Sequence, residues 1–471
     1  MAYFLLPLRY RWILLLAASY YFYMCWKAEY AILLVISTLI DYCAGLKMAS
    51  AKSASQKKRY LLVSIISNLG LLFSFKYFNF FNESLRTLLN SWNIMYNVPA
   101  FHALLPVGIS FYTFQTMSYS IDVYRGEQQP ERHFGMFALY VTFFPQLVAG
   151  PIERSTSLLP QFSECHAFDV KRAVHGLQLM LWGFFKKVVI ADRLAWYVNA
   201  VYNQPEQFHG LPIFFATYAF AFQIFCDFSG YSDIAIGAAE VMGFRLMQNF
   251  KRPYFSKSIA EFWQRWHISL STWFRDYLYI PLGGNRVTPA RRDLNVFIVF
   301  VVSGLWHGAN WTFLAWGALH GGYFLTAMRT ARLRQRLTTR LHLDRWPQLL
   351  HGWRVFVTFH LVLLSWVFFR ANSLSDAFLL LKNGFDLSAV MTQLLAFNPL
   401  QGIPINRYET VIALFVVSIM EIAHLMQHNG SIRAWLSNQP RWLRWGAYYA
   451  AIVSILVFGV FFQTEFIYFQ F

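Results

Sequence analysis

Runs rich in apolar residues recur along the whole chain, and this recurrence constrains the fold more than any other feature of the sequence. A helix that crosses the hydrocarbon core of a bilayer needs about 20 predominantly apolar residues. Only 13% of the residues are charged, which is about half the share that is usual in soluble domains. We therefore expect an all-α, polytopic membrane protein with about 10–12 membrane helices, some of them short or re-entrant, and no separate soluble domain. The apolar runs cover residues 12–26, 28–46, 61–81, 98–121, 134–152, 174–190, 211–225, 231–244, 294–328, 350–369, 410–426 and 446–463.

The formal net charge of +17 is explained mostly by membrane topology, because Lys and Arg mark the loops that stay in the cytoplasm. The loops 47–60, 251–293 and 329–349 are basic, and we expect all three to be cytoplasmic. Nucleic-acid binding would need a basic face on a soluble module, so no nucleic acid is expected as a partner. A minor share of the charge is expected to serve an anionic cytoplasmic ligand, such as a phosphorylated acyl carrier.

Neither a metal site nor a cleavable signal is expected from the cysteines and the N-terminal region. The four cysteines are scattered without metal-ligand spacing, so no metal site is expected. No cleavable signal is expected either, because no small-residue cleavage site follows the apolar stretch behind Arg9 and Arg11.

His307 lies where an imidazole is costly. The stretch 294–328 contains no Asp, Glu, Lys or Arg, and hydrocarbon offers no water to a titratable side chain. Such a group normally faces a protein-lined or wet cavity, and its default interpretation is functional. The alternative is a histidine that packs helices together and bonds to a neighbouring carbonyl. We place the chemistry of the chain near His307.

The same stretch is expected to form a hairpin. Both of its flanking loops are basic, so the chain must enter the bilayer and return within about 35 residues. This favours short or broken helices with the deepest point at Gly308–Trp311, where glycine and polar residues interrupt the apolar run. One long tilted helix is the alternative.

Residues 258–277 are predicted to form an amphipathic helix, because their apolar residues recur at helical spacing. Ser258 and Glu261 fit a capping box at its start. A helix of this kind lies in the plane of the membrane interface, and His267 falls at the edge of its apolar stripe.

A polar run, residues 225–233, interrupts another apolar stretch. Its functional interpretation is a polar lining, with Asp227, Ser229 and Tyr231, for the cavity that holds His307. The alternative is a polar break between helices, where hydroxyls satisfy backbone groups that the break leaves unpaired. The two interpretations are compatible.

Several long motifs, in a fixed order, resemble those of the membrane-bound O-acyltransferases, and most of all the bacterial alginate O-acetyltransferase branch. The resemblance extends from about residue 10 to the end of the chain, although members of the family commonly begin with an additional apolar segment. The motifs are LLPVGISFYTFQTMSYSIDVYRG (104–126), VAGPIER (148–154), FCDFSGYSDIAIG (225–237), EFWQRWHISLSTWFRDYLYIPLGGNR (261–286), GLWHGANWTFLAWGALHG (304–321) and EFIYFQF (465–471).

The resemblance implies a fold, a site and partners. The implied fold is a single membrane domain over residues 1–471, a ring of helices around a thinned centre with a tunnel through it. His307 corresponds to the catalytic histidine of the Trp-His-Gly motif, His320, in the pattern that follows it, is a second candidate catalytic residue, and His267 is a further family histidine near the active funnel. The implied donor is acetyl-coenzyme A or another acyl thioester, with no tightly bound cofactor. The implied partners are a periplasmic acetyltransferase and a polysaccharide acceptor, at the bacterial inner membrane.

Acyl transfer to a hydroxyl explains what such residues do. A hydroxyl is a weak nucleophile at neutral pH, so a positioned base must take its proton, and histidine suits this task. The tetrahedral intermediate needs hydrogen-bond donors, for which Asn310, Trp306 and Trp311 are the candidates. Arg265, Arg275 and Arg286 are candidates for the donor's phosphates, with topology as the alternative reason for their charge. His360, His424 and His428 are expected to be structural.

Two alternative functions stay open at this point. One keeps the chemistry and changes the acceptor, to peptidoglycan or, with D-alanyl transfer, to teichoic acid. The other is a transporter of polysaccharide or lipid intermediates, although a transporter would more naturally show paired repeats with matching broken helices.

Overall fold

The structure is a computed structural model that describes residues 2–403, 406–427, 430–461 and 466–467. In these ranges all regular structure is helical, which confirms the all-α prediction. Six helical stretches of the described chain are long and apolar enough to cross a membrane, so a multi-pass membrane protein is supported. The six are Ala28–Ala49, Ala54–Ser91, Val170–Tyr202, Leu211–Met242, Pro347–Arg370 and Tyr408–Met426, fewer than the number of about 10–12 expected from the apolar runs.

The chain groups into two compact units, each of which is described by itself. The first contains Met1–Leu177 with Ala235–Gln248, and the second contains Gln178–Ile234 with Asn249–Phe471. The expectation of one domain over the whole chain stays a prediction.

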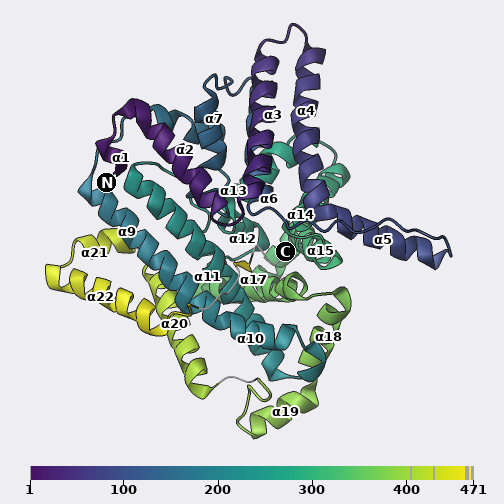
Figure 1. Cartoon of the computed structure of the whole chain (residues 1–471). Helices are drawn as coiled ribbons and strands as arrows, with labels where there is room; N and C mark the ends of the chain where they lie inside the picture. The colour runs from purple at the N-terminus through teal and green to yellow at the C-terminus, as the bar shows by residue number, and fades with distance from the viewer. Residues whose placement is uncertain (1, 404–405, 428–429, 462–465, 468–471) are drawn as a thin grey trace. The chain divides into compact units, whose positions relative to one another are not determined.

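In the first unit, α3 (Ala31–Ala49) and α4 (Ala54–Leu72) lie side by side, and both pack on α6 (Ile109–Arg125) (Figure 1). Asp41 of α3 is fully buried and accepts a hydrogen bond of 2.5 Å from the Ser64 hydroxyl of α4. Polar groups inside a membrane protein must be satisfied by other protein groups, so this contact fixes how α3 and α4 face each other.

In the second unit, α11 (Leu211–Met242) is one unbroken helix of 32 residues, which continues into the first unit. The alternative interpretation of residues 225–233, a polar break between helices, is therefore wrong. Asp227, Ser229 and Asp233 of this run contact lysines of a neighbouring helix, so these polar side chains do not interrupt the backbone hydrogen bonds of α11.

That neighbour is the continuous helix built from α9 (Val170–Phe184), the π-helical turn η4 (Phe185–Ala191) and α10 (Asp192–Tyr202). It approaches α11 closely at two glycines, because a Cβ atom added to Gly183 would lie 2.6 Å from the backbone oxygen of Gly230. Small residues of this kind let membrane helices come into backbone contact.

The predicted hairpin is present in the second unit. α14 (Pro289–His307) and α15 (Trp311–Arg329) pack along their length, and residues 308–310 connect them. The expectation of short or broken helices is wrong, because each helix has 19 residues and α14 begins in the polar segment before the apolar run. At the open end of the hairpin, Arg329 Nε donates to Asp293 Oδ2 (2.9 Å), and this hydrogen bond with that of Arg292 holds the pKa of Asp293 below its ordinary value.

The predicted single helix over residues 258–277 is also wrong. The chain forms α12 (Ile259–Arg265) and α13 (Ile268–Phe274), and between them His267 takes a left-handed backbone conformation with φ of 44°. The start is as predicted, because Ser258 Oγ accepts a hydrogen bond from Glu261 N (3.2 Å). Periodicity alone did not predict the break, because both halves keep helical spacing.

Candidate active site

His307 is the last residue of α14 and only 3% of it is exposed. Aromatic rings surround it: the centroids of Trp306, Trp316 and Phe369 lie 5.0, 5.1 and 5.4 Å from that of His307. The next residue must be small, because a Cβ atom on Gly308 would lie 2.1 Å from the Phe313 ring. The Trp-His-Gly sequence thus places an imidazole at the turn of the hairpin, inside an aromatic enclosure.

His267 comes from a different segment and reaches the same place. Its ring centroid is 6.3 Å from that of His307, and the ring is fully buried. Nδ1 lies 3.2 Å from Asn249 Oδ1. Because a carbonyl oxygen only accepts, Nδ1 carries the proton in the neutral ring and Nε2 carries the lone pair. The left-handed backbone at residue 267 turns this side chain toward the hairpin, so the structure brings these two predicted histidines together.

His320 is buried in α15, and hydrogen bonds engage both of its ring nitrogens. The Trp263 indole N–H donates to Nδ1 (3.3 Å), so Nε2 carries the proton and donates to Ser365 Oγ (2.8 Å). Trp316 lies between the two histidines of the hairpin, with its ring 4.9 Å from His320 and 5.1 Å from His307. This arrangement suits a residue that orients its neighbours better than one that takes a proton.

The polar residues of α11 belong to a buried charge network with the adjacent helix. Lys187 Nζ lies 2.6 Å from Asp227 Oδ1 and 2.8 Å from Asp192 Oδ1. Lys186 Nζ pairs with Asp233 Oδ2 (2.7 Å) and donates to Ser229 Oγ (2.9 Å). Sequence reasoning missed both lysines and Asp192, although two adjacent lysines inside the otherwise apolar run 174–190 were the available signal.

The α11 network borders the histidines through one aromatic ring. Phe228 lies between Asp227 and Ser229 in the chain, and its ring centroid is 4.6 Å from that of His267. The backbone N–H of Ile467 donates to Asp227 Oδ2 (2.7 Å), and the Tyr231 ring lies 5.4 Å from that of Phe466. These are the two residues of the closing EFIYFQF motif that the structure describes, and both contact α11.

Asn310 has a structural task. Its Oδ1 accepts a hydrogen bond from Thr312 N (3.1 Å), which caps α15, and its Nδ2 donates to the backbone oxygen of Asn372 (3.0 Å). Of the other two candidate oxyanion donors, Trp306 is buried against His307, whereas 53% of Trp311 is exposed.

The three arginines predicted to meet donor phosphates lie on separate segments. Arg265 of α12 is paired with Glu261 (2.6 Å), and Arg275 is paired with the adjacent Asp276 (2.7 Å). Arg286 is exposed in the loop before α14. Two of the three already have a carboxylate partner, so a phosphate would have to compete for them.

The other histidines, which the sequence predicts to be structural, make hydrogen-bond or packing contacts where they are described. His360 lies 2.6 Å from the Tyr218 hydroxyl, and His424 is buried with its ring 5.4 Å from that of Phe225. His428 lies outside the described residues. Within the described ranges, no three His, Cys, Asp or Glu side chains are grouped so that they could hold a metal ion.

Comparison with known proteins gives one family. The model of the membrane-bound O-acyltransferase family matches residues 67–372, a range that contains His267, His307 and His320. A probable alginate O-acetylase of Azotobacter vinelandii is 42% identical over 377 residues, which are 80% of this chain and 72% of that protein. A peptidoglycan O-acetyltransferase of Helicobacter pylori is 36% identical, over 80% of this chain and 74% of its own. A teichoic acid D-alanyltransferase of Streptococcus thermophilus is 29% identical, over 56% of this chain and 68% of its own.

Proposed function

The chain belongs to the membrane-bound O-acyltransferase family, and from this premise we propose that it transfers acetyl groups from an acyl thioester to hydroxyls of an extracytoplasmic polysaccharide, with His307 as the general base. The single observation that supports this role best is the enclosure of the His307 imidazole by aromatic rings, next to His267. The family membership makes the chain an O-acyltransferase; the acetyl group, the acceptor and the roles of single residues are proposals.

The proposed reaction balances with one base. A nitrogen of His307 takes the proton of the acceptor hydroxyl while its oxygen attacks the thioester carbonyl carbon. The oxyanion of the tetrahedral intermediate accepts a hydrogen bond, which we assign to the indole N–H of Trp306. The carbon–sulfur bond then breaks, and the imidazolium returns the proton to the leaving thiolate. The products are an ester and a free thiol.

The aromatic enclosure has a second task in this proposal. An acyl thioester is hydrolysed when water reaches its carbonyl during activation, and a site that excludes water prevents this side reaction. Trp306, Trp316 and Phe369 leave 3%, 0% and 1% of their surface exposed. Rings so thoroughly buried leave little space for water beside His307.

The names of the relatives support the proposed acceptor. The Azotobacter vinelandii protein is a probable alginate O-acetylase and is 42% identical, whereas the teichoic acid enzyme is 29% identical over a smaller share of the chain. We therefore propose an alginate-like polysaccharide as the final acceptor. Acetyl-coenzyme A or an acyl carrier would be the donor, a periplasmic acetyltransferase would be the partner, and the bacterial inner membrane would be the location. Peptidoglycan is the second candidate acceptor, because its O-acetyltransferase is 36% identical over the same share of the chain.

The test is acetyl transfer by the purified full chain in lipid nanodiscs, supplied with labelled acetyl-coenzyme A and either alginate or peptidoglycan oligomers. We expect His307→Ala to lower turnover by about 10²- to 10⁴-fold, the usual contribution of a general base. His360→Ala is the matched control, because that histidine lies outside the aromatic enclosure. If wild type and His307→Ala consume the donor equally, the assignment of the base is wrong.

A further inference from the structure

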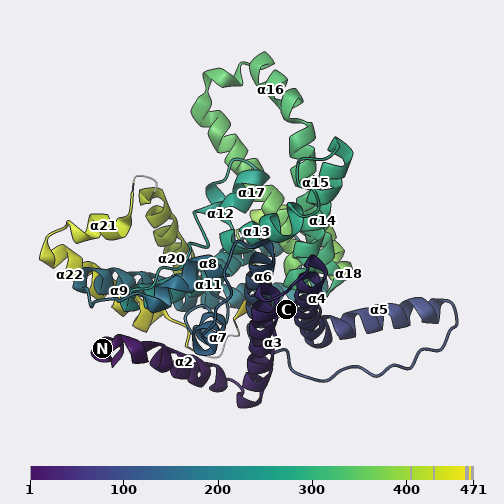
Figure 2. The same ribbon diagram turned by 90° about the horizontal axis from the view of Figure 1, so that it is seen from above.

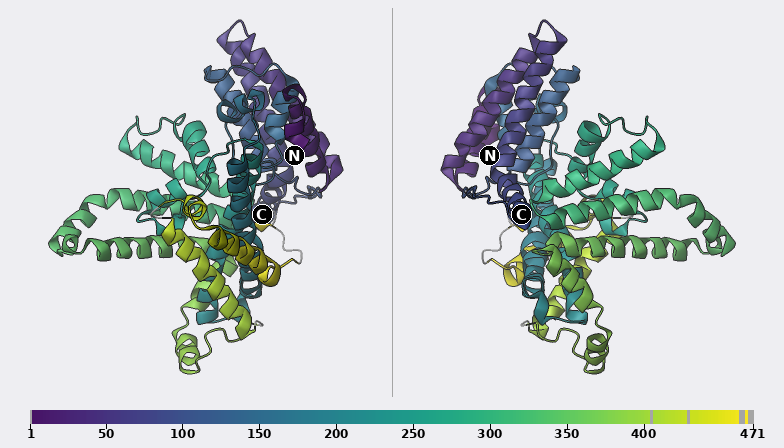
Figure 3. Two further views of the ribbon diagram at one scale, coloured as in Figure 1. Left: turned by 90° about the vertical axis from the view of Figure 1, so that its left-hand side faces the viewer. Right: turned by 90° about the vertical axis from the view of Figure 1, so that its right-hand side faces the viewer.

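α16 (Ala331–Arg340) is a basic helix that the proposed acyl transfer does not use. It carries four arginines and no acidic residue among its ten residues, and none of these residues is buried. It follows α15 and precedes α17 (Pro347–Arg370), one of the six candidate membrane spans. Figure 2 and Figure 3 show this segment, in green, at the far end of the α15 and α17 helices, away from the other helices of its unit.

The side chains of α16 are sorted around the helix axis. Leu333, Leu337 and the C-cap residue Leu341 recur every four residues and form a narrow apolar stripe, because four residues advance slightly more than one turn. These leucines are exposed, by 56%, 46% and 63%. The arginines follow the same spacing one position earlier, at 332, 336 and 340, and so form a row along one side of the leucine stripe.

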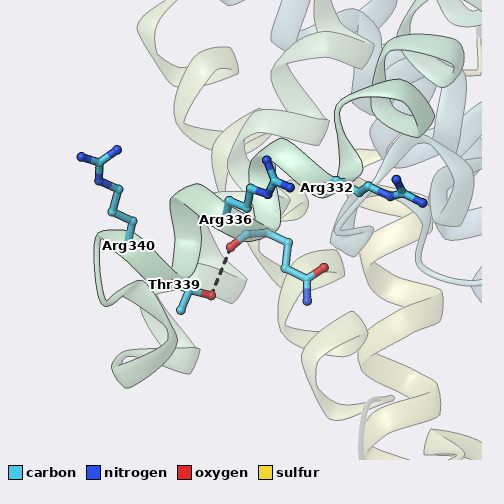
Figure 4. Close-up of a pocket in the computed structure, with 5 residues that line it drawn as sticks. Arg332, Arg336, Thr339 and Arg340 are labelled. Atoms are coloured by element: carbon cyan, nitrogen blue, oxygen red, sulfur yellow. Dashed lines mark hydrogen bonds between the residues drawn. The ribbon is translucent and has the colours of Figure 1, made fainter.

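The arginine row borders an open depression on the helix surface. The depression is lined by Arg332, Gln335, Arg336, Thr339 and Arg340 (Figure 4). Guanidinium groups bind phosphate oxygens with two parallel hydrogen bonds, and the Gln335 and Thr339 side chains add neutral polar groups. The lining therefore favours a phosphate group over a neutral ligand.

A second, independent observation, two exposed tryptophans at the start of α17, indicates that α16 lies near the membrane surface. Trp346 and Trp353, at the start of α17, are exposed by 66% and 59%. Tryptophan is enriched at the boundary between headgroups and acyl chains. Leu349 and Phe356, on the same side of α17, are exposed by 65% and 52% and suit contact with lipid chains. The candidate span thus begins at the interface, and α16 comes directly before it.

We propose that α16 lies on the membrane surface and binds the phosphate headgroups of anionic phospholipids. The leucine stripe enters the boundary of the acyl chains, and Arg332, Arg336 and Arg340 hold the phosphates beside it. A helix with a narrow apolar stripe flanked by arginines is suited to this position. A free phosphate ester offers the same polar chemistry, and only the leucine stripe distinguishes the lipid.

The experiment measures lipid binding by the purified full chain, with native mass spectrometry during titration in detergent. The probes are phosphatidylglycerol, phosphatidylcholine and soluble glycerol phosphate, and no acyl donor is present. Each arginine near an anionic surface contributes roughly 1 kcal/mol. We therefore expect R332Q/R336Q/R340Q to bind phosphatidylglycerol on the order of 100-fold more weakly.

Three matched variants keep the result interpretable. K52Q/K58Q/R59Q removes the same charge from exposed positions before and in the first turns of α4, in the first unit, and should leave lipid binding unchanged. R332K/R336K/R340K keeps the charge and should retain most of the binding. L333S/L337S/L341S should lose binding of phosphatidylglycerol, although this variant keeps all the arginines. Thermal unfolding of each variant reports whether it is folded.

Three outcomes overturn the lipid assignment. The first is that wild type binds phosphatidylcholine as tightly as phosphatidylglycerol, the second is that glycerol phosphate binds as tightly as the lipid, and the third is that the glutamine variant keeps wild-type binding of phosphatidylglycerol. None of these outcomes depends on acyl transfer, so the surface assignment and the proposed enzymatic function fail separately.

Discussion

At the scale of single residues, the site depends on which atoms of each histidine are engaged. His320 uses both ring nitrogens in hydrogen bonds, to Trp263 and Ser365, whereas Nδ1 of His267 donates to Asn249 and its Nε2 keeps the lone pair. A base needs an unprotonated nitrogen that faces the reacting hydroxyl. Both ring nitrogens of His320 are engaged, which makes it the weaker candidate for the base, and His307 lies at the hairpin turn with His267 beside it.

The proposed oxyanion donor gives a prediction at this scale. Trp306→Phe keeps an aromatic ring beside His307 and removes the indole N–H. We expect turnover to fall by about 10²- to 10³-fold with little change in KM, because an oxyanion donor acts mainly in the transition state. Steady-state kinetics of the nanodisc enzyme measure both constants.

The control for this prediction is Trp366→Phe. Trp366 is equally buried and packs on Trp316 and Phe369, two walls of the aromatic enclosure. Equal losses in the two variants would show that packing, and not the indole N–H, is responsible.

Asn310 gives a second residue-scale prediction. Asn310→Asp keeps the oxygen that caps α15 and removes the amide donor, whereas Asn310→Ala removes both. We expect the alanine variant to lose about 1 kcal/mol of unfolding free energy, the usual cost of a lost N-cap, and the aspartate variant to keep turnover near wild type. Turnover that is equally low in both folded variants would instead make Asn310 an oxyanion donor.

At the scale of elements, the α14–α15 hairpin depends on glycines at its contact. A Cβ atom added to Gly317 would lie 2.4 Å from the backbone oxygen of Phe300, whereas one added to Gly322 meets nothing within 4 Å. Both glycines belong to α15, so the helix-forming tendency of alanine is the same in both variants.

These glycines predict opposite effects of one substitution. Gly317→Ala should push the two helices apart and lower the unfolding temperature and turnover together. Gly322→Ala should leave turnover unchanged and raise stability by up to about 1 kcal/mol, the difference in helix propensity between the two residues. Unfolding in detergent measures the stability, and similar results for the two positions would mean that α14 and α15 do not touch here.

The charge network between η4 and α11 gives another prediction at this scale. Lys187→Met removes the cation that contacts both Asp192 and Asp227, and breaking one partner of a buried pair costs about 3–5 kcal/mol. Lys187→Met combined with Asp227→Asn should recover part of this loss, because less unpaired charge remains buried. A double-mutant cycle in detergent unfolding reports the coupling, and strictly additive losses would mean that the two residues do not interact.

At the scale of the whole molecule, the positions of the basic loops predict the topology. The loops 47–60 and 329–349 are expected in the cytoplasm. The candidate span Pro347–Arg370 then places Ser388, in α19 (Leu387–Leu395), on the opposite side. One exposed residue in each of these three segments can be tested: Ser55, Thr339 and Ser388.

Single cysteines at these positions test the topology. In a background without Cys25, Cys43, Cys165 and Cys226, an impermeant maleimide applied to intact cells should label Ser388→Cys only. Ser55→Cys and Thr339→Cys should react only after the membrane is opened. Labelling of Thr339→Cys from outside would place α16 on the other face and contradict the expected orientation of α17.

The sequence by itself determined the class of this protein and predicted a position for its chemistry. Apolar length specifies a helical membrane protein, because hydrocarbon leaves backbone groups no other partner. A histidine in the uncharged stretch 294–328, within motifs that resemble those of a known family, is the position that the sequence predicts for the reaction. Both conclusions depend on local composition and order, which the chain carries without folding.

Only the tertiary structure decided how these residues meet. Periodicity did not predict the left-handed backbone at His267 that turns its ring toward His307, since the residues on both sides keep helical spacing. Apolar runs did not predict that α11 continues through Asp227, because the lysines that satisfy its polar side chains come from another helix. Contacts of this kind join segments far apart in the chain, and their energy depends on packing and burial that no single stretch of sequence contains.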